Sequence, residues 1–225
     1  MNEKNHSLNH NLSLLDKVIM HVDLARKTLL VKPKTHVRDY PVSTKFASTK
    51  QDAQLSEQEK KHAASLMRVN HTGEVCAQAL YQGQAITARS QDTVEKMQEA
   101  AHEELDHLAW CNQRLAELDS HASYLNFLWY MGALSIGITA GVIGDKWSLG
   151  FLAETEEQVV HHLESHLDKL PEQDINSREV IKQMRDDEAK HRDMALDNGA
   201  AELPGVIKKL MKFSSGIMTK ISYRV

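Results

Sequence analysis

Five pairs of residues in this chain have the spacing Glu-x-x-His, which places a carboxylate and an imidazole one turn apart on the same face of a helix. Dimetal sites in four-helix bundles use this motif twice, with one further Glu from each of two other helices. The pairs are Glu3/His6, Glu59/His62, Glu99/His102, Glu104/His107 and Glu188/His191. Because the chain has 13 His among 225 residues, chance matches are expected, and spacing alone does not select the functional pairs.

The apolar stripe of each predicted helix selects two of these pairs, because a ligand in a bundle core lies on that stripe despite its charge. Glu104 and His107 fall among the apolar residues of their helix, whereas Glu99 falls on the opposite face. Glu188 and His191 fall on a comparable stripe, although an arginine lies at each of its edges. The two remaining pairs have simpler explanations: Glu3 lies in a polar tail, and Glu59 is the capping partner of Ser56 at the start of a helix.

Two other acids, Glu74 and Glu156, pass the same test and complete a repeated plan. In an antiparallel hairpin, residues equally far from the turn lie level with one another. The midpoint between Glu74 and the histidine of the next pair falls near residues 90–92, and the midpoint after Glu156 falls at residues 171–174. Both stretches carry turn-forming residues. The sequence therefore predicts two hairpins, each of which brings one Glu level with a Glu-x-x-His pair.

Four carboxylates inside one bundle would repel one another and lose hydration, at a cost of about several kcal/mol each. Two divalent cations would neutralise this charge, and neutral histidines would complete the sites. Carboxylate-rich ligation with one His per metal favours iron or manganese over zinc. Any one of these residues, taken singly, is more often a solvated or ion-paired side chain. The set that passes both tests predicts a metal site formed by Glu74, Glu104, His107, Glu156, Glu188 and His191.

Long helices must position these residues, and the composition favours helices. With 10 Gly, 4 Pro and 5% aromatic residues, the chain has too few turn and strand formers for a sandwich or barrel of short strands. We expect an all-α fold in three segments: an N-terminal amphipathic helix and linker at 1–50, a four-helix bundle at 51–203 and a basic amphipathic segment at 204–225. Periodicity and capping signals predict helices over 12–30, 56–89, 92–118, beyond the apolar segment to about 170, from about 175 to 199, and over 206–225. The apolar segment at 124–144 is expected to be the long connection between the second and third helices of the bundle.

Composition argues against a nucleic-acid partner and against an oxidising compartment. With 27 Lys and Arg against 31 Asp and Glu, the chain has no overall positive field for a phosphate backbone, so we expect no nucleic-acid partner. Two cysteines cannot build a disulfide framework, and no zinc-type Cys/His spacing occurs, which fits a reducing compartment. The N-terminus has the pattern of neither a secretory signal nor a transit peptide.

Two segments point to a membrane surface. Residues 124–144 carry no charge, but their four glycines and several polar residues make a weak span, so we expect this segment to dip into the bilayer from one side. Residues 206–225 carry five basic and no acidic residues among apolar ones, which is typical of a helix on an anionic membrane. The alternative for this last helix is ordinary packing against the bundle.

Four local motifs make the chain recognisable. They are Leu-Met-Arg-Val-Asn-His-Thr-Gly-Glu-Val at 66–75, His-Glu-Glu-Leu-Asp-His-Leu at 102–108, Gly-Asp-Lys-Trp-Ser-Leu-Gly-Phe at 144–151 and Asp-Glu-Ala-Lys-His at 187–191. Together they resemble the demethoxyubiquinone hydroxylase family of ubiquinone biosynthesis, from about Leu55 to the C-terminus. The resemblance implies a ferritin-like bundle whose di-iron ligands fall on the six residues named above. Thr72 and Phe127 depart from the family pattern, at positions outside the ligand set.

The resemblance also implies the reaction, which is hydroxylation of the ring of a demethoxy polyprenyl quinol by dioxygen. Two Fe ions per chain would serve as the cofactor, and NADH is the expected electron donor, although no Rossmann fingerprint occurs. Glu104 and Glu188 are the expected bridging carboxylates, since each helix that supplies a His also brings its Glu between the metals. We expect a peripheral, monotopic protein on the cytoplasmic face of the bacterial inner membrane, in contact with lipid and its polyprenyl quinol substrate.

Two other functions remain open on the sequence. A ferritin-like iron storage or detoxification protein would also use two Glu-x-x-His helices, although the uncharged segment has no use in a soluble shell. A non-enzymatic lipid-binding scaffold would leave four inward carboxylates unexplained. Tail length, the physiological donor, homo-oligomerisation, association with other ubiquinone-biosynthesis proteins and the roles of His71, His161 and His162 are not determined by the sequence.

Overall fold

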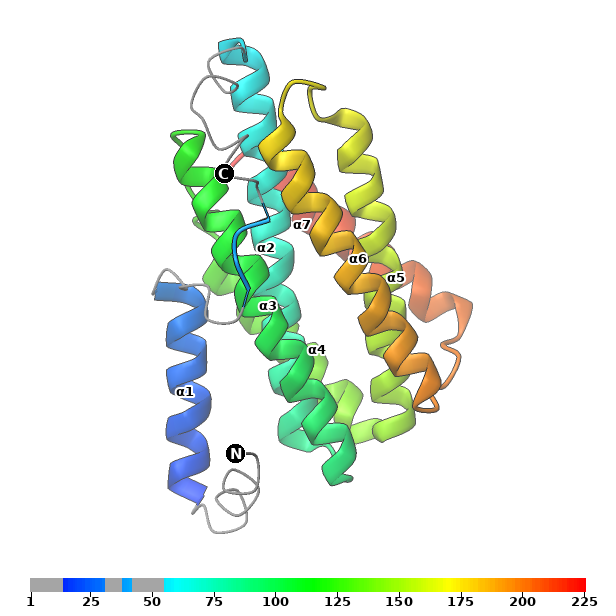
Figure 1. Cartoon of the computed structure of the whole chain (residues 1–225). Coiled ribbons are helices and arrows are strands. Elements are labelled where there is room, and N and C mark those ends of the chain that lie inside the picture. The colour runs from blue at the N-terminus through cyan, green and yellow to red at the C-terminus, as the bar shows by residue number, and fades with distance from the viewer. Residues whose placement is uncertain (1–13, 31–37, 42–54) are drawn as a thin grey trace.

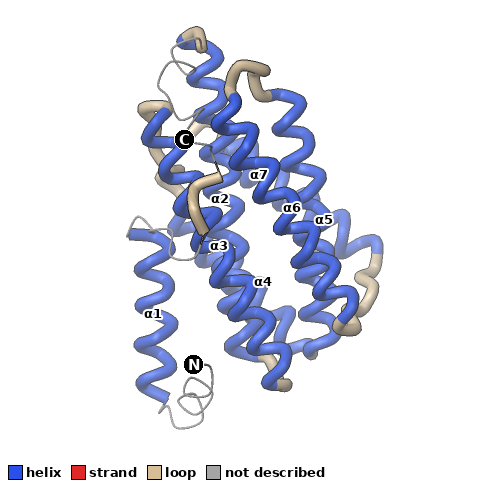
Figure 2. The backbone as a smooth tube through the Cα atoms, viewed as in Figure 1, coloured by secondary structure: helices blue, strands red, loops and turns tan. Residues whose placement is uncertain are grey.

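The computed structural model describes residues 14–30, 38–41 and 55–225, and every regular element in these ranges is a helix (Figures 1 and 2). The helices are α1 (Leu14–Leu30), α2 (Glu57–Thr87), α3 (Gln91–Glu117), α4 (Asn126–Ile143), α5 (Asp145–Lys169), α6 (Ile175–Asp197) and α7 (Gly205–Ser222). The expected all-α class is confirmed. Most of the expected linker and the first 13 residues lie outside the described part of the chain.

Helices α2, α3, α5 and α6 form the predicted ferritin-like bundle, with α2 and α3 as one hairpin and α5 and α6 as the other (Figure 1). Its interior holds two clusters of buried apolar side chains. One lies toward the α5–α6 turn and includes Met67, Trp110 and Met184. The other lies toward the α2–α3 turn and includes Leu108 and Leu152. Charged side chains occupy the core between these two clusters, where burial is costly unless they are paired or bind metal.

Local signals explain where the bundle helices begin and end. Ser56 and Glu59 form the predicted capping box of α2, in which each side chain accepts a hydrogen bond from the backbone N–H of the other residue. The expected start of the next helix at Asp92 is wrong by one residue, because Ser90 is the N-cap of α3 and its hydroxyl accepts from the Thr93 N–H. Beyond α6, Gly199 has a positive φ of 85°, which suits glycine.

The apolar segment, expected to connect the second and third helices of the bundle, forms a helix of its own, α4. Gly144 adopts φ 136° and separates α4 from α5, the third helix of the bundle, which ends at Lys169 close to the expected residue 170. Helix α4 runs beside α2 and is the long connection between the hairpins. Gly137 permits this contact, since a Cβ there would lie 2.3 Å from the Leu80 carbonyl oxygen. By length and composition α4 is able to cross a membrane, and only 28% of it is buried in the protein.

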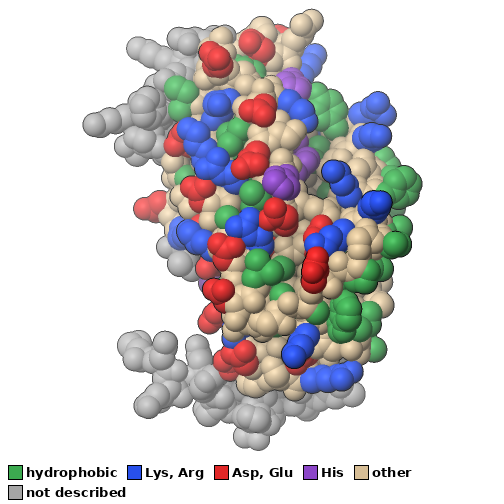
Figure 3. Space-filling view, turned by 90° about the vertical axis from the view of Figure 1, so that its right-hand side faces the viewer, with side chains coloured by type: hydrophobic (Ala, Val, Ile, Leu, Met, Phe, Trp, Pro, Cys, Tyr) green, Lys and Arg blue, Asp and Glu red, His purple; other side chains and the backbone are tan. Residues whose placement is uncertain are grey.

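The two terminal helices lie outside the bundle. Helix α7 contacts α2 and α5, and Lys208 forms an ion pair of 3.2 Å with Glu154 of α5. Its apolar residues Val206, Leu210 and Phe213 are nevertheless exposed. The space-filling view shows hydrophobic side chains gathered along one edge of the molecule, with Lys and Arg side chains beside them (Figure 3). Packing against the bundle, the alternative for α7, therefore explains its contacts with α2 and α5 but not its exposed apolar residues.

Candidate metal centre

The structure places all six candidate ligands in one buried region of the bundle. Each helix contributes as the hairpin argument predicts: one Glu from α2, one Glu from α5, and a Glu-x-x-His pair from each of α3 and α6. None of the six is more than 5% exposed. The residues brought together are Glu74, Glu104, His107, Glu156, Glu188 and His191.

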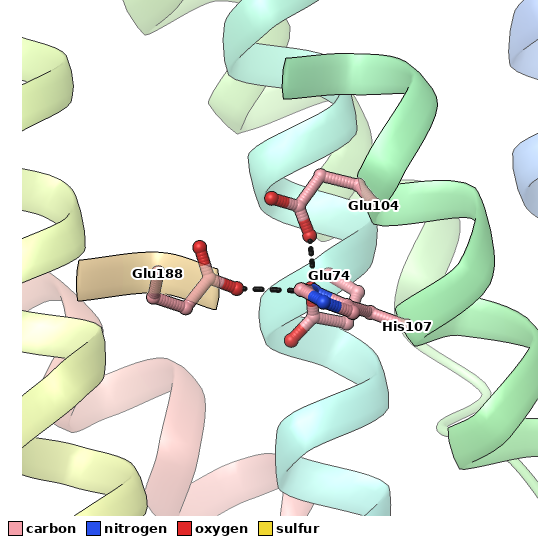
Figure 4. A group of neighbouring side chains, drawn as sticks. All are labelled: Glu74, Glu104, His107 and Glu188. Atoms are coloured by element: carbon pink, nitrogen blue, oxygen red, sulfur yellow. Dashed lines mark hydrogen bonds and ion pairs between the residues drawn. The ribbon is translucent and has the colours of Figure 1, made fainter. Parts of the chain in front are cut away.

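His107 lies at the centre of the cluster that Figure 4 shows. Its Nδ1 atom is 3.0 Å from Glu104 Oε2, 3.2 Å from Glu188 Oε1 and 3.5 Å from Glu74 Oε2. One potential ligand atom from each of these four residues lies within 4.8 Å of every other, close enough to hold a metal ion. The four come from α2, α3 and α6, so the cluster joins both hairpins.

His191 lies on the other side of the same two carboxylates. Its Nδ1 atom is 3.2 Å from Glu188 Oε2 and 3.4 Å from Glu104 Oε1. Glu104 and Glu188 therefore each present one oxygen to each histidine. Glu156 interacts with Glu188 and accepts a hydrogen bond from the Tyr81 hydroxyl. The arrangement has an approximate twofold plan, with two outer carboxylates and two shared ones.

The electrostatics of the metal-free cluster separate the outer carboxylates from the shared ones. Burial, together with the charge of Glu104, raises the pKa of Glu74 well above its ordinary value, and burial with the charge of Glu188 does the same for Glu156. Burial also opposes ionisation of the shared pair, but the histidines outweigh it and hold both pKa values below the ordinary value. Mutual repulsion among the four carboxylates therefore raises the pKa of the outer pair but not of the shared pair.

The donor set fits a two-metal centre. Within residues 55–225 the ion pairs of the shared carboxylates run to His107 and His191. Burial lowers the pKa of each histidine, but neighbouring carboxylates outweigh it, so both pKa values are raised. Glu104 Oε1 is buried and accepts no hydrogen bond in the described part of the chain, and its 3.4 Å ion pair with His191 is a contact that a metal could replace.

Two acids outside the expected ligand set hold the outer sides of the two histidines. His107 Nε2 is 3.3 Å from Asp187 of α6, and His191 Nε2 is 3.1 Å from Glu103 of α3. Hydrogen bonds of this kind orient a metal-ligating imidazole and fix its tautomer. A signal was present, because each acid immediately precedes the Glu of a Glu-x-x-His motif. The crossed pairing, in which each acid serves the histidine of the other helix, is visible only in the structure.

A cavity of about 590 Å³ lies between α1, α2 and the start of α4. Apolar side chains such as Leu29 and Phe127 line it, together with His71, Asn112 and Asn126. Burial lowers the pKa of His71 to about 4, so its imidazole is neutral at physiological pH. His161 and His162, whose roles the sequence left open, lie away from this cavity on α5. His161 is exposed and pairs with Glu157 and Glu164, and the ring of His162 packs against that of His166.

The sequence of this chain matches one protein family and several named relatives. The family described as ubiquinone biosynthesis protein COQ7 matches residues 54–222. A Chromobacterium violaceum protein named 3-demethoxyubiquinol 3-hydroxylase is 53% identical over 215 residues, which cover 94% of this chain and 100% of that protein. A Legionella pneumophila protein of the same name is 51% identical and covers 95% of this chain and 98% of its own length. A third, from Ralstonia pickettii, is 58% identical over 171 residues, 76% of this chain and 79% of that protein.

Proposed function

This chain belongs to the ubiquinone biosynthesis protein COQ7 family, and we propose that it hydroxylates the ring of a 3-demethoxyubiquinol with dioxygen during ubiquinone biosynthesis. The observation that carries the proposal is the buried cluster of Glu74, Glu104, His107 and Glu188, which two hairpins build in a chain that aligns along almost its whole length with hydroxylases of this name. A buried carboxylate cluster without cations would be costly, so its presence favours a cofactor role over a structural one.

We propose that the cluster holds two iron ions. Glu74 and His107 would be terminal ligands of one ion, and Glu156 and His191 of the other. Glu104 and Glu188 would bridge the pair, because each offers one oxygen toward each histidine. Carboxylate-rich sites with one imidazole per metal suit iron.

When bound, such a pair supplies the two electrons that dioxygen must receive before an oxygen atom can add to an electron-rich ring. The role of this chain's own residues is to bind, orient and exclude water. Asp187 and Glu103 hold the histidines in place, and the apolar layers above and below keep the cluster dry. Reducing equivalents come from an external donor, for which NADH is our proposal.

The cavity beside His71 is the proposed entrance for the quinol ring. It lies one helical turn from Glu74 along α2 and borders the first residues of α4, the most apolar helix of the chain. The neutral imidazole and two amides offer donors and acceptors to ring oxygens, and the apolar wall suits the polyprenyl tail. The ring can thus enter from lipid while its tail remains there.

We also propose that the protein is monotopic and lies on the cytoplasmic face of the inner membrane, and the same geometry supports the monotopic part of this proposal. If α4 crossed the bilayer, the α2–α3 hairpin and the α5–α6 hairpin would lie on opposite sides, yet His107 of the first hairpin contacts Glu188 of the second. Exposed apolar residues on α4 and the basic α7 can instead hold the bundle on an anionic surface. Labelling of cysteines introduced at Ser120 and Thr155 from opposite sides of sealed vesicles would overturn this arrangement.

One assay tests the proposed activity directly. Iron-loaded protein, reduced without oxygen, is mixed with a demethoxyquinol and oxygen, and the product is identified by mass. We expect the mass of one added oxygen atom in the ring. Iron binding without turnover would favour the storage alternative, and failure to bind any metal would favour the lipid-binding scaffold.

A further inference from the structure

A short N-terminal segment, Arg38–Pro41, lies against the bundle beside the cluster. Tyr40 packs against the apolar cluster that contains Trp110, and its hydroxyl donates to Glu117 at 3.3 Å. The guanidinium of Arg38 lies over the Trp110 ring, 4.8 Å from its centroid. This segment therefore has its own contacts with α3, although it belongs to the part of residues 1–50 that is expected to be a linker.

Arg38 joins two buried acids from opposite hairpins. Its Nε atom donates to Asp106 of α3 at 3.1 Å, and its Nη1 atom donates to Asp187 of α6 at 2.5 Å. The side chains of these acids are only 4% and 1% exposed, against 29% for the arginine. A planar guanidinium can satisfy two carboxylates at once, which an ammonium group cannot do with the same geometry.

The same arginine lies behind one histidine of the cluster and not the other. Arg38 Nη2 is 3.4 Å from His107 Nε2, on the side of the ring opposite the shared carboxylates. Asp187, which accepts from Arg38, is also the acid that faces His107 Nε2. The equivalent partner of His191 is Glu103, whose side chain is 49% exposed. The two halves of the cluster are therefore electrostatically unequal, although their ligands repeat.

We propose that Arg38 is a positioning residue that holds Asp187 on His107 and raises the reduction potential of the metal bound beside His107. A fixed positive charge near a metal disfavours its more oxidised state, because the added charge is repelled. Hydrogen bonding from Arg38 also weakens Asp187 as an acceptor for His107 Nε2, so the imidazole donates less charge to the metal. Both effects shift the potential in the same direction. This inference rests on the proposed di-iron site.

The test is a redox titration of iron-loaded protein, with the mixed-valence signal followed by electron paramagnetic resonance. We expect Arg38→Gln to move the midpoint to a more negative potential while iron remains at two per chain. Arg38→Lys should lie between the wild type and Arg38→Gln, because it keeps the charge but cannot bridge both acids. Arg26→Gln is the matched control, since Arg26 also pairs with an acid, Asp23, but on α1.

A double variant separates charge from simple anchoring of the segment. Arg38→Gln with Asp106→Asn removes one positive and one negative charge, so its midpoint should return toward the wild-type value. An unchanged midpoint in Arg38→Gln with two bound irons, even with lowered stability, would overturn the inference and leave the proposed function intact. Iron-free wild-type protein after anaerobic loading would instead refute the proposed function. Loss of iron from Arg38→Gln would also overturn the inference, unless Arg38→Lys retains two irons per chain and its midpoint lies below that of the wild type.

Discussion

His107 on α3 lies 3.2 Å from Glu188 on α6, and this contact joins two hairpins that the chain connects only through α4. Neither hairpin alone contains a complete cluster, because each supplies two Glu and one His. The shared carboxylates of Glu104 and Glu188 make the two halves interdependent. A change in one half should therefore affect metal binding by both.

Removal of either shared carboxylate is expected to abolish hydroxylation. Glu104→Ala and Glu188→Ala each take away a proposed bridging ligand, so iron should fall below two per chain when measured after anaerobic loading. Glu99→Ala is the control, because Glu99 lies on the same helix but is exposed. Full activity and two irons in either Ala variant would contradict the ligand assignment.

Metal binding is expected to stabilise the protein more at pH 7 than at pH 5. In the metal-free protein the raised pKa values of Glu74 and Glu156 mean that the folded state binds protons more tightly than the unfolded chain, so stability falls as pH rises above about 4.3 toward the folded values. The raised pKa values of His107 and His191 stabilise the fold below about 6.5, and this contribution is lost as pH rises through their folded values.

The lowered pKa values of the shared carboxylates act only at lower pH, because their stabilising contribution is present above about 4.3 and is lost as pH falls through the folded values. Metal binding must displace the bound protons, so its stabilising effect grows with pH. Melting temperatures of metal-free and iron- or manganese-loaded protein at pH 5 and pH 7 measure this. Equal melting of both forms at pH 7 would argue against a buried metal site.

Filling the cavity from α1 is expected to impair substrate binding without loss of metal. Ala25 lines the cavity, so Ala25→Trp should raise KM for the quinol by about tenfold or more, which corresponds to about 1.4 kcal/mol of lost binding. Iron content should remain at two per chain. Val22→Trp is the control on the same helix, because Val22 is exposed. An unchanged KM in Ala25→Trp would rule out this cavity as the quinol entrance.

The close contact of α4 with α2 is expected to tolerate no side chain at Gly137. Gly137→Ala would place Cβ 2.3 Å from the Leu80 carbonyl oxygen, and overpacking of this kind costs about 1–3 kcal/mol. The matched control is Gly132→Ala on the same helix, where a Cβ meets nothing within 4 Å and should stabilise by about 0.5–1 kcal/mol. Urea unfolding of both variants in detergent measures the difference, and equal stability would contradict the observed contact.

The sequence alone determined the faces of the helices and the levels at which the candidate ligands meet. A helix turns 100° per residue, so the position of Glu104 or Glu156 among apolar neighbours is a local property that can be read without a structure. Turn residues near 90 and 171 then set the register of each hairpin. These local rules were sufficient to select the residues that the structure brings together.

Only the tertiary structure decided how the two hairpins complete each other. Whether Asp187 faces His107, and whether Arg38 crosses from a distant segment to join Asp106 and Asp187, depends on packing between elements far apart in the chain. No helical period encodes such contacts. The separation of α4 from α5 at Gly144 likewise follows from a backbone that returns along α2 and must then reverse into the second hairpin. Sequence periodicity sets which face is buried, and tertiary packing sets what that face meets.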